Sequence, residues 1–172
     1  LMNKGFEIIE AVRLFGVPED RVDVVIHRQS IIHSLVEYND NTMLAELGRP
    51  DMRDCIRYAL TAPHCKKVRS ERLSLADIGS LTFASPDISA FPLLDTAREA
   101  IRTGGTMPAS LIAADEVAVD AFISGKIRFT EIPSVVEKTL GKVKLSREIT
   151  EESVASAVHE TKRIALSLIT SD

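Results

Sequence analysis

The sequence predicts an α+β fold, in which a mixed region of helix, strand, β-hairpin and helix precedes a C-terminal bundle of four helices. Runs rich in strand-forming residues lie within residues 22–47, whereas apolar residues after position 91 recur at helical spacing. With 45% hydrophobic and 27% charged residues among 172, the chain can bury a core without disulfides. These patterns divide it into residues 1–62, a connecting segment 63–90 and residues 91–172.

Residues 4–15 form the first predicted element, which is a helix. Their apolar side chains recur at helical spacing, and the Gly16-Val17-Pro18 sequence ends the pattern. The β-branched run 22–26 follows this stop and predicts a short strand. The first region therefore begins as a helix followed by a strand.

A β-hairpin is predicted after this strand. Residues 31–38 and 42–47 are rich in strand-forming side chains, and the turn-forming sequence Asn39-Asp40-Asn41 separates them. Asp51 is then placed as the N-cap of a helix over residues 51–60.

The segment 63–90 shows no periodic pattern. It is basic at first and then carries turn residues, so it is predicted to be a linker or a long connection between the two regions.

Two helices open the C-terminal region. The helix over residues 92–103 ends at Gly104-Gly105, which is a typical C-terminal stop. Residues 108–124 are apolar almost all round, so this helix is expected at the centre of the bundle, with Gly125 at its end.

Two more helices complete the predicted bundle. Thr130 is expected to cap a helix that runs to about Leu140, and Thr150 to cap one that runs to about Thr170. Glu151 and Glu152 follow Thr150, and their negative charges interact favourably with the positive, N-terminal end of the helix dipole. Short connections between four helices favour a bundle.

Charge and composition exclude several classes of function. Lys plus Arg is 21 and Asp plus Glu is 25, so the net charge is −4, which argues against nucleic-acid binding and against an anionic membrane surface. The sequence contains no transmembrane-length apolar run and no glycine-rich nucleotide-phosphate loop. Cys55 and Cys65 match neither a disulfide framework nor a zinc motif, so they are interpreted as reduced thiols of a cytoplasmic protein.

The clearest chemical group lies at the start of the first helix. Asn3 and Glu7 are four residues apart and share a face, and Lys4 is next to Asn3. A lysine at a helix N-terminus suits phosphate, and a glutamate is an oxygen ligand for Mg²⁺ or Mn²⁺. The alternative from the residues alone is a set of solvated first-turn side chains, and one carboxylate is too few for a metal site.

Two further groups have both structural and functional interpretations. His27 ends the predicted strand, and His33 is expected within the next strand on the same face as Ile31 and Leu35. Each histidine could be a hydrogen-bonded structural group, and their spacing fits no zinc motif. The Gly48-Arg49-Pro50-Asp51-Met52 sequence is by itself a turn and a helix cap, with Met52 as a core residue.

These groups together resemble the motifs of one enzyme family along nearly the whole chain. The sequence is similar to the 1-deoxy-D-xylulose 5-phosphate reductoisomerases at five places. The matching residues are Asn3-Lys4-Gly5 with Glu7 and Glu10-Ala11, His27-x-Gln29-Ser30-Ile31-Ile32-His33-Ser34, Leu44-Ala45-Glu46-Leu47-Gly48-x-Pro50-Asp51-Met52, Leu81-Thr82-Phe83-x-x-Pro86-Asp87, and Glu116-x-Ala118-Val119-x-Ala121-Phe122.

The resemblance implies a reaction and its cofactors. The family rearranges 1-deoxy-D-xylulose 5-phosphate and reduces the product with NADPH to 2-C-methyl-D-erythritol 4-phosphate, in the non-mevalonate pathway of isoprenoid biosynthesis. A divalent cation (Mg²⁺, Mn²⁺ or Co²⁺) chelates the substrate and polarises its carbonyl group. The resemblance also implies a homodimer, with the sheet region at the contact.

Roles for individual residues follow from the matching motifs. The resemblance makes Glu7 a metal ligand that also touches the substrate, and it makes Asn3 and Lys4 substrate-binding residues. His33 matches a histidine needed for efficient use of the substrate. The resemblance further implies that Pro50 and Met52 line the nicotinamide side.

Three short departures from the family pattern stand out. Arg28 occupies the place of a usual proline, and Glu46 that of a usual glutamine. The run Ala113-Ala114-Asp115-Glu116 replaces an Asn-Ala-Ala-Asn-Glu sequence, a change expected to affect polar packing rather than catalysis.

Length is the larger departure. Family members are more than twice as long, and the NADPH-binding domain, the other metal carboxylates and the phosphate-binding serines precede the segment that matches Leu1. We therefore expect a C-terminal fragment that is inactive alone and needs residues absent from this chain to bind NADPH and the cation. The alternative is a free-standing, non-catalytic assembly module derived from the enzyme.

Overall fold

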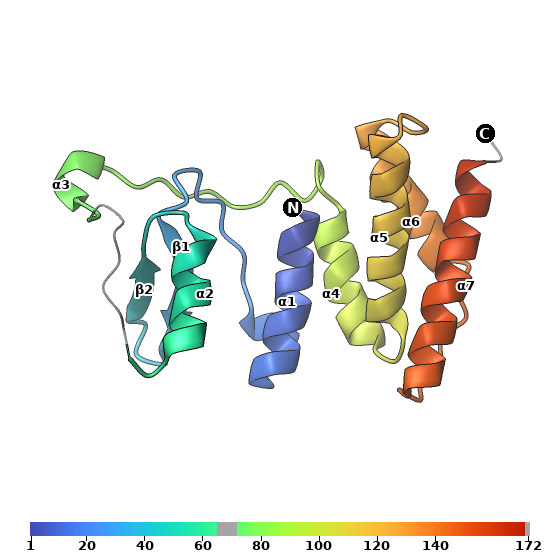
Figure 1. Ribbon diagram of the computed structural model, residues 1–172, viewed down its shortest axis with the longest axis horizontal. Helices are drawn as coiled ribbons and strands as arrows, with labels where there is room; N and C mark the ends of the chain where they lie inside the picture. The colour runs from blue at the N-terminus through green and yellow to red at the C-terminus, as the bar shows by residue number, and fades with distance from the viewer. Residues whose placement is uncertain (65–71, 171–172) are drawn as a thin grey trace. The chain divides into compact units, whose positions relative to one another are not determined.

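The computed structural model describes residues 1–64 and 72–170, which contain helices and one two-stranded sheet (Figure 1). They form two compact units, which are described separately below. Among the described residues, the helical unit comprises 1–24 and 86–170, and the hairpin unit comprises 25–64 and 72–85. Helix α1 therefore groups with the C-terminal helices rather than with the hairpin that follows it in sequence.

Five long helices build the helical unit. Helix α5 packs against α4, α6 and α7, while α1 packs on the other side of the same unit against α4 (Figure 1). The helices are α1 (Met2–Phe15), α4 (Leu93–Thr103), α5 (Met107–Ile123), α6 (Ile132–Leu140) and α7 (Glu151–Ile169). All five predicted helices of this unit are confirmed, and α5 is the central one, as its apolar sequence indicates.

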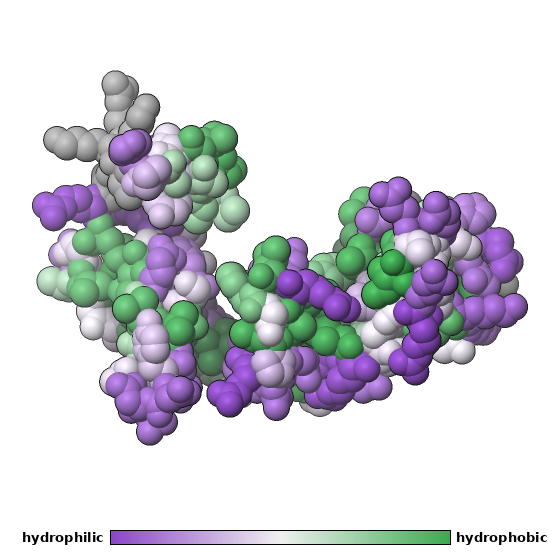
Figure 2. Space-filling model, turned by 90° about the horizontal axis from the view of Figure 1, so that it is seen from below, coloured by the Kyte–Doolittle hydropathy of each residue, from purple (hydrophilic) through white to green (hydrophobic). Residues whose placement is uncertain are grey.

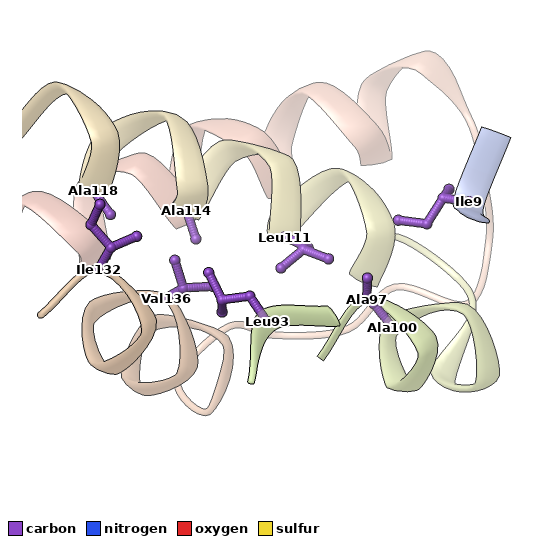
Figure 3. Close-up of a cluster of buried hydrophobic side chains, with 9 residues drawn as sticks. All are labelled: Ile9, Leu93, Ala97, Ala100, Leu111, Ala114, Ala118, Ile132 and Val136. Atoms are coloured by element: carbon purple, nitrogen blue, oxygen red, sulfur yellow. The ribbon is translucent and has the colours of Figure 1, made fainter. Parts of the chain in front are cut away.

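The core of this unit is built mainly from small and branched apolar side chains (Figure 3). Ala97, Leu111 and Val136 are fully buried where α4, α5 and α6 meet. Ile9 of α1 joins the same cluster, so the first helix is anchored to the core of the C-terminal helices. The alanines allow the helices to approach closely.

Helix ends follow the predicted signals with one exception. Gly16 and Gly104 end α1 and α4 with positive φ angles, and the Thr150 side chain accepts a hydrogen bond from the Ser153 backbone at the start of α7. The predicted cap at Thr130 is wrong. This residue lies inside a 3₁₀ turn, Phe129–Glu131, because the Glu131 carboxylate accepts the Arg128 backbone N–H at 2.7 Å and α6 begins only afterwards.

The run that departs from the family pattern lies on α5. Ala113 and Ala114 are buried, and partial burial raises the pKa of the Asp115 carboxyl, with the neighbouring Glu116 charge adding to the effect. Glu116 pairs with Lys162 of α7 at 2.7 Å. Of the two carboxylates of this run, Glu116 is thus exposed and bridges α5 to α7, whereas Asp115 is partly buried.

The hairpin unit contains the predicted hairpin and helix. Strands β1 (Ile32–Glu37) and β2 (Met43–Leu47) are antiparallel, with Asn41 in the turn at a φ of 64°. Helix α2 (Met52–Thr61) follows, and Asp51 caps it by accepting the Arg53 backbone N–H at 3.0 Å. A short helix, α3 (Leu75–Ile78), lies in the predicted connecting segment.

No described residue of the hairpin unit is fully buried. Hydrophobic side chains lie open at the surface of this unit, at the left of Figure 2, and Val36, Met43 and Leu44 are more than half exposed. The unit therefore depends on hydrogen bonds and partial packing rather than on a closed core.

The predicted strand over residues 22–26 is wrong. Only Ile26 pairs with another backbone segment, in a single bridge to Ala84. The Val22 carbonyl instead accepts a hydrogen bond from Arg98 at 2.9 Å, so a side chain occupies the position that a strand partner would need.

Two other expectations concern the cysteines and the membrane. Cys55 is exposed on α2 and free, whereas Cys65 lies outside the described residues. Within residues 1–64 and 72–170, no helix has the length and apolar character needed to cross a membrane.

Candidate functional site

The first turns of α1 bring three predicted site residues into direct contact. Asn3 Nδ2 donates to Glu7 Oε1 at 2.9 Å, and Lys4 Nζ donates to Glu7 Oε2 at 2.7 Å. Both carboxylate oxygens are therefore engaged, one by an amide and one by an ammonium group. We call Asn3, Lys4 and Glu7 the α1 triad.

The α1 triad is open to solvent. The Lys4 and Glu7 side chains are 48% and 44% exposed. An ion pair at this exposure contributes about 0–1 kcal/mol, so a ligand can separate it at little cost. Lys4 can then face an anionic group while Glu7 keeps an oxygen free for a hydroxyl group or a cation.

Close packing on the opposite face fixes the place of the α1 triad. Gly5 is buried, and a Cβ atom there would lie only 2.7 Å from the Ala97 Cβ of α4. Ile8 and Ile9 continue this face at 1% and 8% exposure. Figure 3 shows Ile9 directed toward the cluster that contains Ala97. Gly5, Ile8 and Ile9, which lie between and directly after the triad members, thus pack α1 against the C-terminal helices.

A second contact joins the segment that follows α1 to helix α4. The Glu19 carboxylate accepts from Arg98 at 2.6 Å and from Arg102 at 3.1 Å. The hydrogen bond from Arg98 is the main reason that the pKa of Glu19 lies below its usual value. We call Glu19, Arg98 and Arg102 the α4 clasp.

The described residues do not form a metal site by themselves. They contain no group of three or more His, Cys, Asp or Glu side chains placed to hold an ion. Glu7 provides one carboxylate, and divalent cations bound by oxygen take several ligands. A cation at the α1 triad would therefore need ligands from outside this set of residues.

His33 lies at an irregularity of the hairpin. Ile32 pairs with Leu47 and Ser34 with Glu46, so His33 is the extra residue of a bulge. The expected alternation with Ile31 and Leu35 is therefore interrupted at His33, because a bulge changes the direction of the side chains on its strand.

Gly48 provides room beside the His33 ring. A Cβ atom at Gly48 would lie 3.7 Å from His33 Nε2 and 3.5 Å from Glu46 Oε1. The imidazole ring and the carboxylate thus flank the same glycine. Glu46, where the family usually has glutamine, adds a negative charge on this side of the hairpin.

Pro50 and Met52 lie in the turn that leads into α2. Both are exposed, with Met52 at 72%, so the interpretation of Met52 as a core residue is wrong. The Arg53 side chain and backbone hydrogen-bond to Asp51 between them and lower its pKa to about 2. The cap holds the turn, and the apolar side chains of Pro50 and Met52 remain accessible.

The predicted site residues thus fall into two groups. Asn3, Lys4 and Glu7 contact one another in the helical unit, whereas His33, Pro50 and Met52 belong to the hairpin unit. Sequence reasoning did not identify Gly5 as the close-packing residue, although a glycine inside a helical pattern is the signal for it.

A family model described as DXP reductoisomerase C-terminal domain matches residues 47–164. Among curated proteins, the 1-deoxy-D-xylulose 5-phosphate reductoisomerase of Acetivibrio thermocellus is 54% identical over 83% of this chain and 37% of its own length. The enzyme of that name from Exiguobacterium sibiricum is 48% identical over 99% of this chain and 44% of its own length. The chain therefore spans less than half the length of these relatives.

Solved structures of the same name share the fold. The 1-deoxy-D-xylulose 5-phosphate reductoisomerase from Zymomonas mobilis in complex with NADPH superimposes with a TM-score of 0.92 at 40% identity, covering 98% of this chain and 44% of that one. A structure of DOX-P reductoisomerase with NADPH, fosmidomycin and magnesium gives a TM-score of 0.89 at 37% identity, with the same coverage.

Proposed function

Since the chain belongs to the DXP reductoisomerase family, we propose that it forms part of an enzyme that converts 1-deoxy-D-xylulose 5-phosphate to 2-C-methyl-D-erythritol 4-phosphate with NADPH. The α1 triad is the observation that carries this proposal, because it joins the phosphate-binding and metal-binding side chains of the family motif at one helix end. The NADPH, magnesium and fosmidomycin bound to the related solved structures support it.

The residues of the α1 triad have distinct proposed roles. Lys4 binds the anionic, polar end of the substrate, since its ammonium group is half-exposed and held by one exchangeable ion pair. Asn3 orients the Glu7 carboxylate and hydrogen-bonds to the substrate. Glu7 contacts a substrate hydroxyl group and offers one carboxylate to the cation, whose remaining ligands come from outside this chain.

The hairpin unit has the second set of proposed roles. His33 is proposed to support the use of substrate, since the bulge and Gly48 leave its ring free on the hairpin surface. The exposed side chains of Pro50 and Met52 are proposed to contact the nicotinamide, for which apolar surface is suited.

The organisation of the longer enzyme is also a proposal. Residues 1–62 would complete a catalytic domain, residues 63–90 would connect, and residues 91–172 would form the C-terminal four-helix domain. We propose a cytoplasmic homodimer in which the NADPH domain and the other metal ligands come from outside these 172 residues. The chain alone is then inactive.

A chimaera tests the proposed function. The 172 residues replace the corresponding part of the Exiguobacterium sibiricum relative, with which they align over 99% of their length. NADPH oxidation with 1-deoxy-D-xylulose 5-phosphate and Mg²⁺ is expected from the chimaera and not from the isolated chain. In the chimaera, Glu7→Gln is expected to lower kcat/KM by more than about 100-fold, since even the outer partners of metal ligands affect activity by 10–100-fold.

Glu10→Gln is the matched control, because Glu10 is exposed on the same helix and lies outside the α1 triad. It is expected to leave kcat/KM within about 2-fold of the unmodified chimaera. Equal losses for Glu7→Gln and Glu10→Gln would contradict the assigned role of Glu7. Activity of the isolated chain would contradict the need for further residues, and a folded but inactive chimaera would favour the assembly module.

A further inference from the structure

Two motifs distant in sequence meet in the hairpin unit. The His27-x-Gln29 segment contacts the Thr82-Phe83 segment, although His27 and Thr82 are 55 positions apart in the sequence. The proposed roles of the chain use none of these four residues. We call His27, Gln29, Thr82 and Phe83 the latch.

His27 makes two contacts at once. Its Nδ1 atom lies 2.8 Å from the Thr82 carbonyl oxygen, and its ring stacks on Phe83 with centroids 4.7 Å apart and planes at 19°. A carbonyl oxygen can only accept a hydrogen bond, so Nδ1 carries the hydrogen. Nε2 is buried and has no hydrogen-bond partner among the described residues. The contacts thus place a hydrogen on Nδ1 and leave Nε2 as the ring nitrogen without a partner.

Gln29 makes the second half of the latch. Its Oε1 atom accepts from the Thr82 hydroxyl at 2.9 Å and from the Thr82 backbone N–H at 3.4 Å, while its Nε2 donates to the Ser80 carbonyl at 3.4 Å. Thr82 is therefore held by both latch residues of the first motif.

A pair of backbone hydrogen bonds continues the contact. Ile26 N–H donates to Ala84 O at 2.8 Å, and Ala84 N–H donates to Ile26 O at 3.0 Å. The latch and this pair join the two ends of the hairpin unit, which extends from residue 25 to 85. No described residue of that unit is fully buried, so these bonds join its two ends without a closed core around them.

The latch is connected to β1 by a short and well-defined path. Ser30 N–H donates to His27 O at 3.1 Å in a turn where Ser30 has a φ of 51°. Gly48 N–H then donates to Ile31 O at 2.9 Å and joins the end of that turn to the hairpin. His33 follows at the bulge.

We propose that the latch positions His33, with His27 acting as a positioning residue through its Nδ1–H tautomer. The link to catalysis rests on the proposed function, since the role of His33 comes from there. The latch itself depends only on the contacts above. A rigidly held start of β1 limits the positions and orientations that the His33 ring can adopt.

Nitrogen NMR of the 172-residue chain tests the tautomer. Long-range proton–nitrogen spectra of the imidazole rings are expected to show His27 with a protonated Nδ1 and a bare Nε2. The exposed His159 on α7 provides the reference ring. A His27 spectrum with the hydrogen on Nε2, or averaged over both nitrogens, would overturn the assignment.

Two variants test the positioning. His27→Phe keeps a ring for Phe83 but removes the hydrogen bond to Thr82, and Gln29→Leu removes both acceptor contacts of Gln29. Each is expected to raise amide hydrogen exchange at Ile26 and Ala84 by about 10-fold or more and to shift the His33 ring resonances, while β1–β2 amide pairs stay protected. His159→Ala is the control and is expected to change neither.

The outcomes separate the latch from the proposed function. Loss of protection at Ile26 and Ala84 with unmoved His33 resonances would leave a purely structural latch and overturn the positioning role. Unchanged exchange in both variants would overturn the latch. In the chimaera, a His33→Ala variant with full activity would instead overturn the role proposed for His33, without affecting the NMR result.

Discussion

Replacing Gly5 with alanine tests whether close packing on α4 holds the first helix. Gly5 lies between Lys4 and Glu7, and its missing side chain is what lets α1 approach Ala97. Alanine within a helix is normally more favourable than glycine by about 0.5–1 kcal/mol. Helix propensity alone therefore predicts that Gly5→Ala stabilises the protein.

The geometry predicts the opposite sign. Non-bonded carbon atoms pack at about 3.5–4.0 Å, whereas the new Cβ would lie 2.7 Å from the Ala97 Cβ. Helices α1 and α4 must then separate by about 1 Å. Overpacking of a closed core costs about 1–3 kcal/mol, and Ala97 is fully buried. After subtraction of the propensity gain, Gly5→Ala is expected to destabilise by about 0.5–2 kcal/mol.

Thermal unfolding followed by the helical circular-dichroism signal measures this change. For a chain of this size, about 0.5–2 kcal/mol corresponds to a Tm lower by roughly 1–8 °C. Gly141→Ala is the matched control in the same unit, because its added Cβ would meet nothing closer than 3.6 Å and its φ is −65°. This control is expected to keep or slightly raise the Tm.

A compensating substitution makes the test specific to the contact. Ala97→Gly removes the opposing Cβ, so the Gly5→Ala/Ala97→Gly double variant is expected to be at least about 1 kcal/mol more stable than the sum of the single changes. A Tm of Gly5→Ala above that of the unmodified chain, or additive effects in the double variant, would refute the close-packing argument.

The remaining predictions concern the clasp, a helix cap and the metal. Glu19 has a lowered pKa when folded, so its stabilising contribution is present above the ordinary pKa and disappears as the pH falls through the lowered one. Urea unfolding should therefore show Glu19→Gln to be less stable than the unmodified chain at neutral pH and equal to it in acid, with Glu10→Gln as control, since Glu10 is exposed and lies outside the clasp; a pH-independent difference would contradict this. Thr150→Ala removes the acceptor of the Ser153 N–H at 3.1 Å and should cost about 1 kcal/mol, or a Tm lower by roughly 2–4 °C, more than Thr170→Ala at the other end of α7. Calorimetry should detect no tight Mn²⁺ binding by the isolated chain, since the described residues offer Glu7 without a cluster of further ligands; micromolar affinity would contradict it.

Local signals in the sequence were sufficient for most of the helices and for the hairpin. The turn at Asn39-Asp40-Asn41, the cap at Asp51 and the box at Thr150 each depend on neighbours within a few residues, so their chemistry is complete in the sequence. The α1 triad is a local feature of the same kind, because side chains three and four residues apart on a helix lie on one face and contact each other.

The predictions are wrong where a group distant in sequence, or a competing side chain nearby, forms the hydrogen bond that the predicted backbone structure needs. The β-branched run at residues 22–26 favours a strand, but Arg98, 76 residues later, takes the Val22 carbonyl. Thr130 is a good cap residue, yet Glu131 reaches back to Arg128 and displaces the helix start. At His33, the bulge that sets the ring direction depends on the pairing of β1 with β2.

By itself, the sequence determined the periodic helices, the hairpin, the α1 triad and the resemblance that the comparisons confirmed. Only the tertiary structure decided that α1 packs with the C-terminal helices, that Gly5 meets Ala97 and that His27 meets Thr82. The physical reason is the range of the interactions. Caps, turns and helical faces are set by neighbours within four residues, whereas close packing and the latch join residues more than fifty positions apart, for which no local pattern exists.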